Sequence, residues 1–475
     1  MKPSDLLSFF KKKVITRPRR HPDVCPKKSG LLRKIGEQLQ KNKIVIYLMT
    51  LAIFGYLSKY AFNLILTHYL KPSLFGDFNI AQRILGILAT LSLLGTNTSS
   101  KLFLSNYLQD RHDINIQSYI KWNTKIIRIP FAICIIIAIS SFAIMHMLHI
   151  WHVKDIRTYH LTIYMLWIAP IASMLTLLNT YLLCANYPVS YAFVANSSNF
   201  FSMVFFLILL VFYEAHEITS FKLFIILSFG LLSLLIVDII LLMKKTPYLF
   251  NLIARALTTK HKHLIEPTWL NMSSRLAING LFCSLIFTID LFILKLISPH
   301  PESVGYYAVT LTIASSLFVI PQNIYITIKA KVNYLLATNE GKKQLEMNIK
   351  ALNRFAVIFT LLLGYCILYY SKTLLHHFGV SYVQAYPILQ ILVFGFIIGT
   401  FAQPAKTILA YSGQVKGLLF ISITELSFML ILCTTLTYLY DIKGIAIATS
   451  LSMIVRTLLF HIVSYRHTQF RSYIL

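Results

Sequence analysis

Charged residues are scarce in this chain, since Asp, Glu, Lys and Arg together make up only 13% of its 475 residues. Hydrophobic residues make up 56%, and the mean hydropathy is +0.66. A soluble domain of this size could not keep so much apolar surface from water, so the composition excludes a soluble protein. The segments between the apolar stretches are too short to hold a catalytic domain. We therefore expect an integral membrane protein whose function lies among its helices.

The sequence also lacks the residue patterns of a metal centre or a disulfide framework. Its six cysteines have no metal-like spacing, and all but Cys25 lie within apolar stretches, which favours small buried residues. The fifteen histidines show no ligand pattern either. Those near helix ends, for which we expect an interfacial or loop role, are His146, His149, His152, His376 and His377. We predict no metal, no cofactor and no enzymatic activity.

Twelve apolar stretches of about twenty residues have the length of membrane spans. They lack the strict alternation of a barrel strand, and lipid tolerates only helices or closed barrels, so we interpret them as helices. The predicted fold is an all-α membrane protein with about 12 transmembrane helices. The expected spans are Ile44–Leu66, Phe78–Gly95, Ile129–Leu148, Leu161–Cys184, Tyr191–Phe212, Phe221–Met243, Leu276–Ile297, Tyr306–Ile328, Phe355–Tyr370, Tyr386–Phe401, Leu418–Tyr438 and Ile445–Val463.

The basic residues predict the orientation. The chain has 44 Lys and Arg against 17 Asp and Glu, a net charge of +27 that by itself is also typical of nucleic-acid binding. With a cytoplasmic N-terminus, about 34 of the basic residues fall on the cytoplasmic side and about five in outer loops, a strong positive-inside bias. We therefore expect a multi-pass protein of the cell inner membrane with both termini cytoplasmic, and no nucleic-acid partner.

The N-terminal segment is the most basic part of the chain and lacks the small-residue cleavage site of a signal peptide. We interpret its charge as an orientation signal that lies against anionic membrane lipids; a specific binding role is the alternative. Its clustered cations include Lys11, Lys12, Lys13, Arg17, Arg19 and Arg20.

Two matches indicate an internal duplication. Segment 72–78 (PSLFGDF) shares its proline, glycine and final aromatic with 301–307 (PESVGYY) at an offset of 229, and 182–189 resembles 408–415 at an offset of 226. In each half, the proline is expected to end one helix and the glycine to begin the return. Six helices per half give a parallel repeat, as in many transporters; a single fused bundle without relative motion is the alternative. The expected parts are a basic cytoplasmic extension (1–43), an N-lobe (44–243), a cytoplasmic linker (244–275), a C-lobe (276–463) and a cytoplasmic tail (464–475).

Several short motifs occur in one order along the chain. They are the turn Leu70–Phe78, the pair Leu94-Gly95, Asp290 followed by 304–307 (VGYY), Phe378-Gly379 with Tyr382, Leu409 with Gly413, and 443–449 (KGIAIAT). Together they resemble the polysaccharide flippases in the oligosaccharidyl-lipid branch of the multidrug/oligosaccharidyl-lipid/polysaccharide exporter (MOP) superfamily. The resemblance covers nearly the whole chain after about Ile44, and it implies a flippase for lipid-linked oligosaccharides.

Three ionisable residues within spans are candidates for substrate binding. Such residues are expensive in lipid and usually face a cavity or one another. Lys59 and Arg83 lie at similar depths, about 10 Å from the outer ends of the first two spans, with Asp290 near that level on the seventh. The excess of positive charge suits an anion such as a pyrophosphate. Snorkelling to the interface or a local ion pair is the alternative.

Further polar residues lie near the same spans. Glu425 and Arg456 are each about seven residues from the cytoplasmic ends of the last two spans, so we predict an ion pair, most simply a structural one. Arg275 opens the seventh span and is a candidate for a headgroup at the inner mouth. Pro321 interrupts the eighth span, where Gln322 and Asn323 are candidates for sugar binding or for a simple kink. Asp238, near the inner end of the sixth span, is expected to be interfacial or hydrogen-bonded.

The predicted function is transport of a polyprenyl-pyrophosphate-linked oligosaccharide across the bacterial inner membrane by alternating access. The resemblance to the polysaccharide flippases implies a role in synthesis of O-antigen, capsule or exopolysaccharide, with a polysaccharide polymerase and chain-length machinery as further partners. An ion gradient is a possible energy source, with Asp290 as the candidate acid. The alternatives are a cation-coupled multidrug exporter of the same superfamily, which needs acidic groups in the cavity, and a membrane glycosyltransferase or polymerase, which needs a substantial outer loop.

Overall fold

The computed structural model describes residues 30–150, 160–213, 218–258, 267–325, 335–336, 339–412 and 415–469. Every structural statement below concerns these residues. Sequence predictions for the cluster Lys11–Arg20, for Cys25, for His152, for Gly413 and for residues 326–328 of the eighth span lie outside them. The pattern of contacts within the chain separates two units, Met1–Ile44 and Val45–Leu475, and the fold and site described below belong to the second unit.

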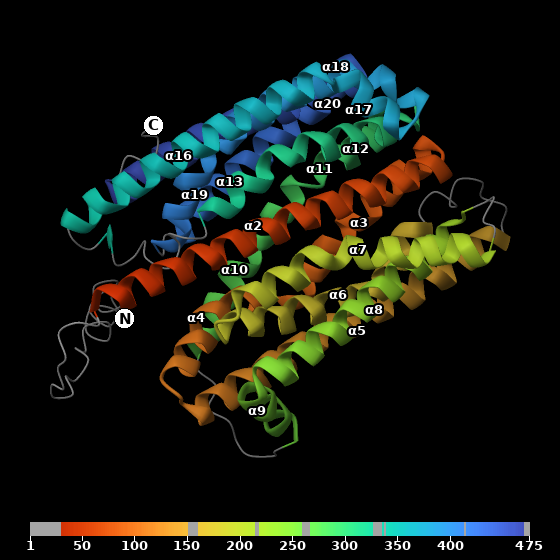
Figure 1. Ribbon diagram of the computed structural model, residues 1–475. Coiled ribbons are helices and arrows are strands. Elements are labelled where there is room, and N and C mark those ends of the chain that lie inside the picture. The colour runs from red at the N-terminus through yellow and green to blue at the C-terminus, as the bar shows by residue number, and fades with distance from the viewer. Residues whose placement is uncertain are drawn as a thin grey trace. The chain divides into compact units, whose positions relative to one another are not determined.

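The described residues form helices and turns, with no strand among them (Figure 1). The first half contains α2 (Gly30–Tyr69), α3 (Pro72–Leu93), α4 (Thr96–Gln109), α5 (Asp113–Ile150), α6 (His160–Cys184), α7 (Pro188–Tyr213), α8 (Ser220–Lys245) and α9 (Pro247–Thr258). The second half contains α10 (Pro267–Ile286), α11 (Ile289–Ile297), α12 (Ser303–Ala314), η2 (Ser315–Phe318), α13 (Val319–Ile324), α16 (Asn339–Tyr369), α17 (Ser371–Phe378), η3 (Val380–Ala385), α18 (Tyr386–Thr400), α19 (Ala402–Tyr411) and α20 (Val415–Thr468).

The helices have the lengths and compositions of membrane spans. Nine helical stretches in the described ranges qualify, and up to eleven if two bent pairs, α3 with α4 and α10 with α11, each count as one span. The longest stretch, α20, is interrupted at Asp441 (φ 49°, ψ −131°), between the two spans predicted at 418–438 and 445–463. The all-helical, multi-pass membrane fold is therefore confirmed, while the count of twelve spans in two repeats stays a prediction.

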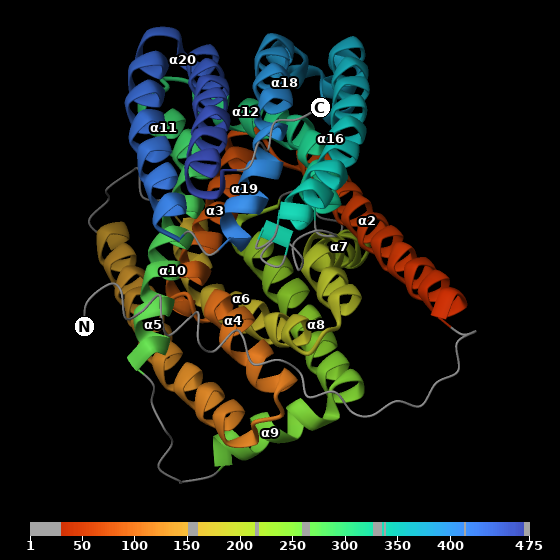
Figure 2. The ribbon, with the colours of Figure 1, turned by 90° about the vertical axis from the view of Figure 1, so that its left-hand side faces the viewer.

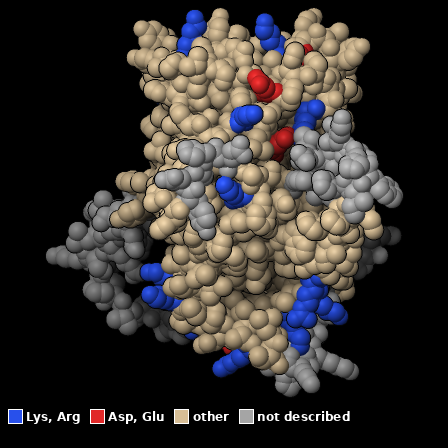
Figure 3. Space-filling model, turned by 90° about the vertical axis from the view of Figure 1, so that its right-hand side faces the viewer, with Lys and Arg blue, Asp and Glu red and all other residues tan. Residues whose placement is uncertain are grey.

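Large apolar side chains cover the outside of the bundle, as expected for a surface in contact with lipid. On α5 alone the exposed side chains include Ile129, Ile133, Ile136, Ile139 and Phe142. The face drawn in Figure 3 is mostly uncharged, with Lys and Arg in small groups and few acidic residues.

The two halves lie beside each other. In Figures 1 and 2, α16, α18 and α20 lie on one side of the bundle and α5, α8 and α9 on the other, with α3 and α10 between them. Helices α3 and α12, which carry the two copies of the proline–glycine motif, pack directly against each other. A Cβ atom on Gly305 would lie 2.0 Å from the Pro72 carbonyl oxygen, and one on Gly76 would lie 2.8 Å from the Gly305 nitrogen.

This contact corrects the interpretation of the motif as a loop. Pro72 stands at the start of α3, where its missing N–H costs no hydrogen bond. Gly76 and Gly305 are both helical and allow two backbones to approach where any side chain would clash. The motif therefore begins helices and joins the two halves, rather than ending one helix and turning the chain.

Several helices extend beyond the predicted spans because polar residues continue them past the apolar stretch. Helix α5 begins at Asp113 rather than near Ile129, and α16 begins at Asn339 rather than near Phe355. The expected linker, 244–275, contains α9 and the first residues of α10. Arg275 therefore lies inside α10 instead of at the opening of a helix.

Two helix breaks shape the interior. Helix α3 ends at Leu94 and Gly95, whose φ angles of 45° and 74° turn the chain by 49° into α4. Gly95 fits there because a Cβ atom would lie 2.2 Å from the Ser273 carbonyl oxygen of α10. The second break, of 46°, separates α10 from α11 at Phe287 and Thr288.

Candidate functional site: a charged cavity between the two halves

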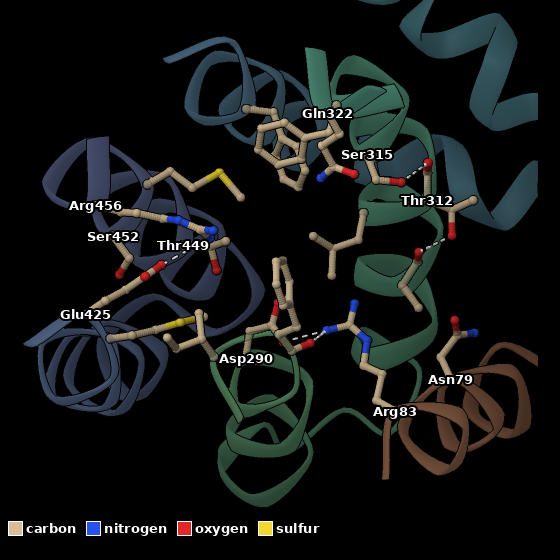
Figure 4. Close-up of a pocket in the computed structure, with 18 of the residues that line it drawn as sticks. Asn79, Arg83, Asp290, Thr312, Ser315, Gln322, Glu425, Thr449, Ser452 and Arg456 are labelled. Atoms are coloured by element: carbon tan, nitrogen blue, oxygen red, sulfur yellow. Dashed lines mark hydrogen bonds and ion pairs between the residues drawn. The ribbon is translucent and has the colours of Figure 1, made fainter. Parts of the chain in front are cut away.

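A cavity of about 410 Å³ lies among α2, α3, α10–α13, α18 and α20 (Figure 4). In Figure 4 an Arg83–Asp290 pair and a Glu425–Arg456 pair lie on different sides, with Gln322, Ser315 and Thr312 on a third. Its polar and charged lining residues are Lys59, Asn79, Gln82, Arg83, Asp290, Thr312, Ser315, Gln322, Glu425, Thr449, Ser452 and Arg456.

Helix α3 contributes Asn79, Gln82 and Arg83, which share one face because they are three and four residues apart. Arg83 lies eleven residues from Pro72 and ten from Leu93, so it is about 16 Å from either end of the helix. Lys59 lies ten residues, about 15 Å, from the end of α2 at Tyr69. Both residues therefore lie about 15–16 Å from the adjoining helix ends at Tyr69 and Pro72, further than the predicted 10 Å, because both helices extend past the apolar stretch there.

The break between α10 and α11 positions the centre of the site. A helix end leaves carbonyl groups without intrahelical partners, and the Phe287 carbonyl accepts a hydrogen bond from Arg83. The same guanidinium nitrogen lies 3.0 Å from the Asp290 carboxylate. Asp290 stands in the first turn of α11, where the helix dipole favours a negative charge. Its carboxylate also accepts bonds from the Leu291 N–H (2.8 Å) and the Tyr307 hydroxyl (3.2 Å).

The second ion pair lies within α20. Arg456 Nη1 is 3.3 Å from Glu425 Oε1, so the structure brings together the two residues that were predicted as partners. The Arg456 guanidinium also lies over the rings of Phe287 (5.6 Å) and Phe460 (5.7 Å), which gives it cation–π contacts. Phe287 is therefore held by two arginines, one at its carbonyl group and one at its ring.

Lys59 is the remaining cation of the cavity, and within the described part of the chain it forms no ion pair. The lining thus holds three cations, Lys59, Arg83 and Arg456, against the two carboxylates Asp290 and Glu425. With all five groups ionised, the net charge is +1. The two carboxylates are already bound to arginines, so the excess charge resides on Lys59.

The Arg83–Asp290 pair belongs to a longer seam between the halves. Helices α3 and α4 both pack against α10, and side chains of α3 also reach α11. The polar contacts of this seam are Asp77 with Lys295, Arg83 with Asp290, Thr90 with Ser284 (3.3 Å), Ser99 with Ser273 (2.7 Å) and Tyr107 with Trp269 (3.1 Å). Movement of one half against the other on this side has to break them.

Of the remaining residues predicted to bind substrate, one lines the cavity and two do not. Gln322 lines the cavity, whereas Asn323 donates a 2.7 Å hydrogen bond to the Val319 carbonyl of its own helix. Arg275 is exposed on α10 and is absent from the cavity lining. The described cysteines are all free, and no described group of three His, Cys, Asp or Glu could hold a metal ion.

Sequence analysis missed several uncharged lining residues. Thr312 and Ser315 precede the Pro321 interruption, and Thr449 and Ser452 share one face of α20. Small hydroxyl residues are common in membrane helices, where they bond their own backbone. The one sequence signal for them was the spacing of three residues within each pair, which places both hydroxyl groups on one helix face at the level of a charged residue.

The comparisons agree with this architecture. Residues 42–334, which are 293 of the 475, match the model of the family described as "Polysaccharide biosynthesis protein". No curated protein matches the chain. Solved structures of similar fold include an inward-facing and an outward-facing multidrug resistance MATE family transporter of the MOP superfamily, both 14% identical. Each alignment covers 90% of this chain. It covers 98% of the inward-facing structure, with a TM-score of 0.63, and 96% of the outward-facing structure, with a TM-score of 0.62.

The eukaryotic MATE transporter AtDTX14 is also similar, at 13% identity and a TM-score of 0.64, with 90% of this chain and 95% of that one covered. Identities this low show a shared fold and no more. The family match extends over more than half of the chain, from the start of the first apolar stretch through Asp290, Gln322 and the break in α10–α11. The chain belongs to the polysaccharide biosynthesis protein family and has the fold of the MOP superfamily transporters.

Proposed function

We propose that this protein is a flippase that moves a polyprenyl-pyrophosphate-linked oligosaccharide across the bacterial inner membrane by alternating access. The observation that carries the proposal is the cavity between the halves of a transporter fold, which is lined by three cations against two carboxylates. A desolvated pyrophosphate needs fixed cations, and Arg and Lys both bind phosphate. The glycan would serve O-antigen, capsule or exopolysaccharide synthesis, which the family match supports.

In this proposal, the pyrophosphate enters the cavity while the polyprenyl chain remains in lipid. Lys59 attracts the anion first because its charge is unpaired. The phosphate oxygens then compete with Asp290 for the Arg83 guanidinium. Since Arg83 and Asp290 belong to different halves, this exchange weakens one contact of the seam and favours movement between the halves. Translocation itself requires no covalent chemistry, in agreement with a non-enzymatic transporter.

Gln322, with Ser315 and Thr312 nearby, offers the sugars uncharged hydrogen-bonding groups on a side of the cavity apart from the two ion pairs. Once Arg83 leaves it, the Asp290 carboxylate retains its bonds from the Leu291 N–H and the Tyr307 hydroxyl but has no cation, and it would then take up a coupling cation. Polysaccharide polymerase and chain-length proteins are the proposed partners that receive the flipped substrate, and both termini are proposed to be cytoplasmic.

Cation-coupled multidrug export is the second candidate, because the similar solved structures are MATE transporters. A cationic drug needs an available carboxylate. Both acidic groups that line this cavity lie within 3.3 Å of an arginine, and the net charge of the lining is positive. This arrangement favours an anionic substrate over a cationic one.

The test uses a strain that lacks the gene for this protein. The proposal predicts that a lipid-linked oligosaccharide accumulates on the cytoplasmic face of the membrane and that surface glycan is lost, both reversed by the wild-type chain. Unaltered lipid-linked glycans together with increased drug sensitivity would instead support the multidrug exporter. Glycosyl transfer or chain extension by the purified protein would support a glycosyltransferase or polymerase.

A further inference from the structure

Asp238 on α8 is a buried carboxylate without a partner. Its exposed fraction is 0%, and neither of its carboxylate oxygens has a hydrogen-bond partner in the structure. One turn away on either side, Leu234 and Leu242 are also buried, at 0% and 1%. This differs from the sequence expectation of an interfacial or hydrogen-bonded group.

The helices around Asp238 supply no countercharge. Helix α8 packs against α6, α7 and α9. Between Leu161 and Tyr213, α6 and α7 contain no Asp, Glu, Lys, Arg or His within their bounds. The charged residues of α8 itself lie near its ends, at Lys222, Lys244 and Lys245, and α9 carries Arg255.

The other titratable groups at this end of α6, α7 and α9 have contacts of their own. Tyr181 accepts a hydrogen bond from Asn123 (3.3 Å), and the Cys184 thiol donates to the Ser100 carbonyl (3.3 Å). Tyr191 lies beneath the Lys101 ammonium (5.9 Å), and Tyr248 donates to Asp113. None of these contacts reaches Asp238, so among the described residues no hydrogen bond or ion pair offsets a negative charge there.

An ionised carboxylate at such a position is very costly, because nothing replaces its lost hydration. A neutral carboxyl group, with a proton on one oxygen, avoids this cost. A second unsatisfied oxygen lies at a similar depth on the neighbouring helix. Asn179 Oδ1 of α6 is buried without a partner, five residues from Cys184, while Asp238 is seven residues from Lys245.

An open crevice lies at this end of the helices. It has a volume of about 1350 Å³ and is lined by the last residues of α6 and α8, including Cys184, Lys245 and Thr246. Asp238 lies about 10 Å further along α8, at 1.5 Å per residue. A small tilt or separation of α8 and α6 would connect the carboxyl group to that crevice.

We propose that Asp238 is a proton-binding site of the first half that exchanges its proton with the crevice at the Lys245 end of α8. In the conformation described here the carboxyl O–H bond is intact. When α8 and α6 separate, that bond breaks, the proton passes to water, and the hydrated carboxylate remains. Reprotonation permits the helices to close again. A proton suits the site better than Na⁺ because a proton needs a single oxygen, whereas a metal cation needs several oxygen ligands arranged around it.

This proposal rests on the proposed function, since it assigns the flippase a proton that its first half takes up and releases. The site is separate from the cavity: Asp290 in the second half is bound to Arg83, Tyr307 and the Leu291 N–H, while Asp238 has none of these contacts.

The first test is infrared spectroscopy of the protein in lipid nanodiscs, with ¹³C-labelled aspartate. The wild type should show at neutral pH a carboxylic-acid C=O band of a weakly hydrogen-bonded group. That band should be absent from Asp238→Asn and present in Asp110→Asn, a matched control at an exposed aspartate. Absence of the band from the wild type overturns the proposal, as does its disappearance on addition of Na⁺ at constant pH, which would mark a sodium site.

The second test measures function in cells and binding in nanodiscs. Asp238→Asn should reach normal membrane abundance and bind a polyprenyl pyrophosphate as the wild type does, yet yield at least tenfold less surface glycan than Asp110→Asn. Normal glycan from Asp238→Asn overturns the proton site. Failure of the wild type to bind polyprenyl pyrophosphate contradicts the proposed function instead, and leaves the infrared result to decide on Asp238 alone. If Asp238→Asn does not accumulate, the labelled wild type still supplies the deciding band.

Discussion

The cavity contains two ion pairs of similar geometry, and they differ in what they connect. Arg83 and Asp290 come from different halves of the protein and lie 3.0 Å apart, whereas Glu425 and Arg456 lie on two stretches of one helix, 3.3 Å apart. In the proposed mechanism, rocking of the halves separates the first pair and can leave the second intact. Arg83 is also the most exposed of the four, at 27%, against 4–12% for the others. The comparison indicates one pair that exchanges its partner and one that holds the second half together.

The largest effect is expected at Arg83. Arg83→Ala should abolish surface glycan in a strain lacking the native protein, even after correction for membrane abundance, because the cation that meets the phosphate is lost. Arg83→Lys should retain part of the activity, as a point charge without the bidentate fork.

Arg83→Ala also leaves Asp290 without its cation, so a matched variant separates the two consequences. Arg83→Ala with Asp290→Asn removes the unpaired carboxylate and should still produce no glycan. Recovery of glycan in this double variant would show that Arg83 serves only to neutralise Asp290.

Substitutions in the second pair should lower the stability of the protein rather than its binding of substrate. Removing either Glu425 or Arg456 leaves an uncompensated charge in the membrane interior, at a cost of about 3–5 kcal/mol. The folded yield, measured by size-exclusion chromatography after detergent extraction, should fall for each single variant. The exchange Glu425→Arg with Arg456→Glu should restore part of it. A swapped protein no better than the singles would contradict the structural role.

Lys59 should have a smaller effect because it meets the anion without holding any helix in place. We expect Lys59→Ala to weaken binding of a polyprenyl pyrophosphate about tenfold, the equivalent of about 1.4 kcal/mol, without loss of folded yield. The titration should be repeated with Lys59→Arg, which keeps the charge and should bind nearly as the wild type. Equal affinity in all three proteins would remove Lys59 from the site.

The smallest predicted difference compares two adjacent amides. Gln322 faces the cavity, and Asn323 bonds its own backbone at Val319. Gln322→Ala should lower transport of the glycan-bearing lipid by a few-fold, the value of one hydrogen bond at about 0.5–1.5 kcal/mol. Asn323→Ala, the matched control, should leave transport unchanged. The reverse order of effects would place the sugar on a different wall.

Charged residues within apolar stretches were the part of the site that sequence could identify. Lys59, Arg83, Asp290, Glu425 and Arg456 all line the cavity because lipid leaves a charge few other positions. Their exact pairing was only partly predictable: Glu425 and Arg456 were matched by level, but the contact of Arg83 with Asp290 depends on how two halves pack.

The break at Phe287 could not be predicted from sequence. Its surroundings contain no proline or glycine between Gly280 and Asp290, so nothing local marks the end of α10. Tertiary packing supplies the compensation, since Arg83 satisfies the freed carbonyl group. The depth of Arg83 was also misjudged, because a span was expected to begin with its apolar residues and α3 in fact begins at Pro72.

The most direct test of the anionic cavity is a binding measurement on the wild-type protein in nanodiscs. A polyprenyl pyrophosphate, the corresponding uncharged polyprenol and an organic drug cation are titrated in parallel. The proposed function predicts that the pyrophosphate binds at least tenfold more tightly than the polyprenol, in a manner that Arg83→Ala abolishes, and that the drug cation does not bind. Tighter binding of the drug cation, lost on Asp290→Asn or Glu425→Gln, would contradict the flippase and establish the multidrug exporter.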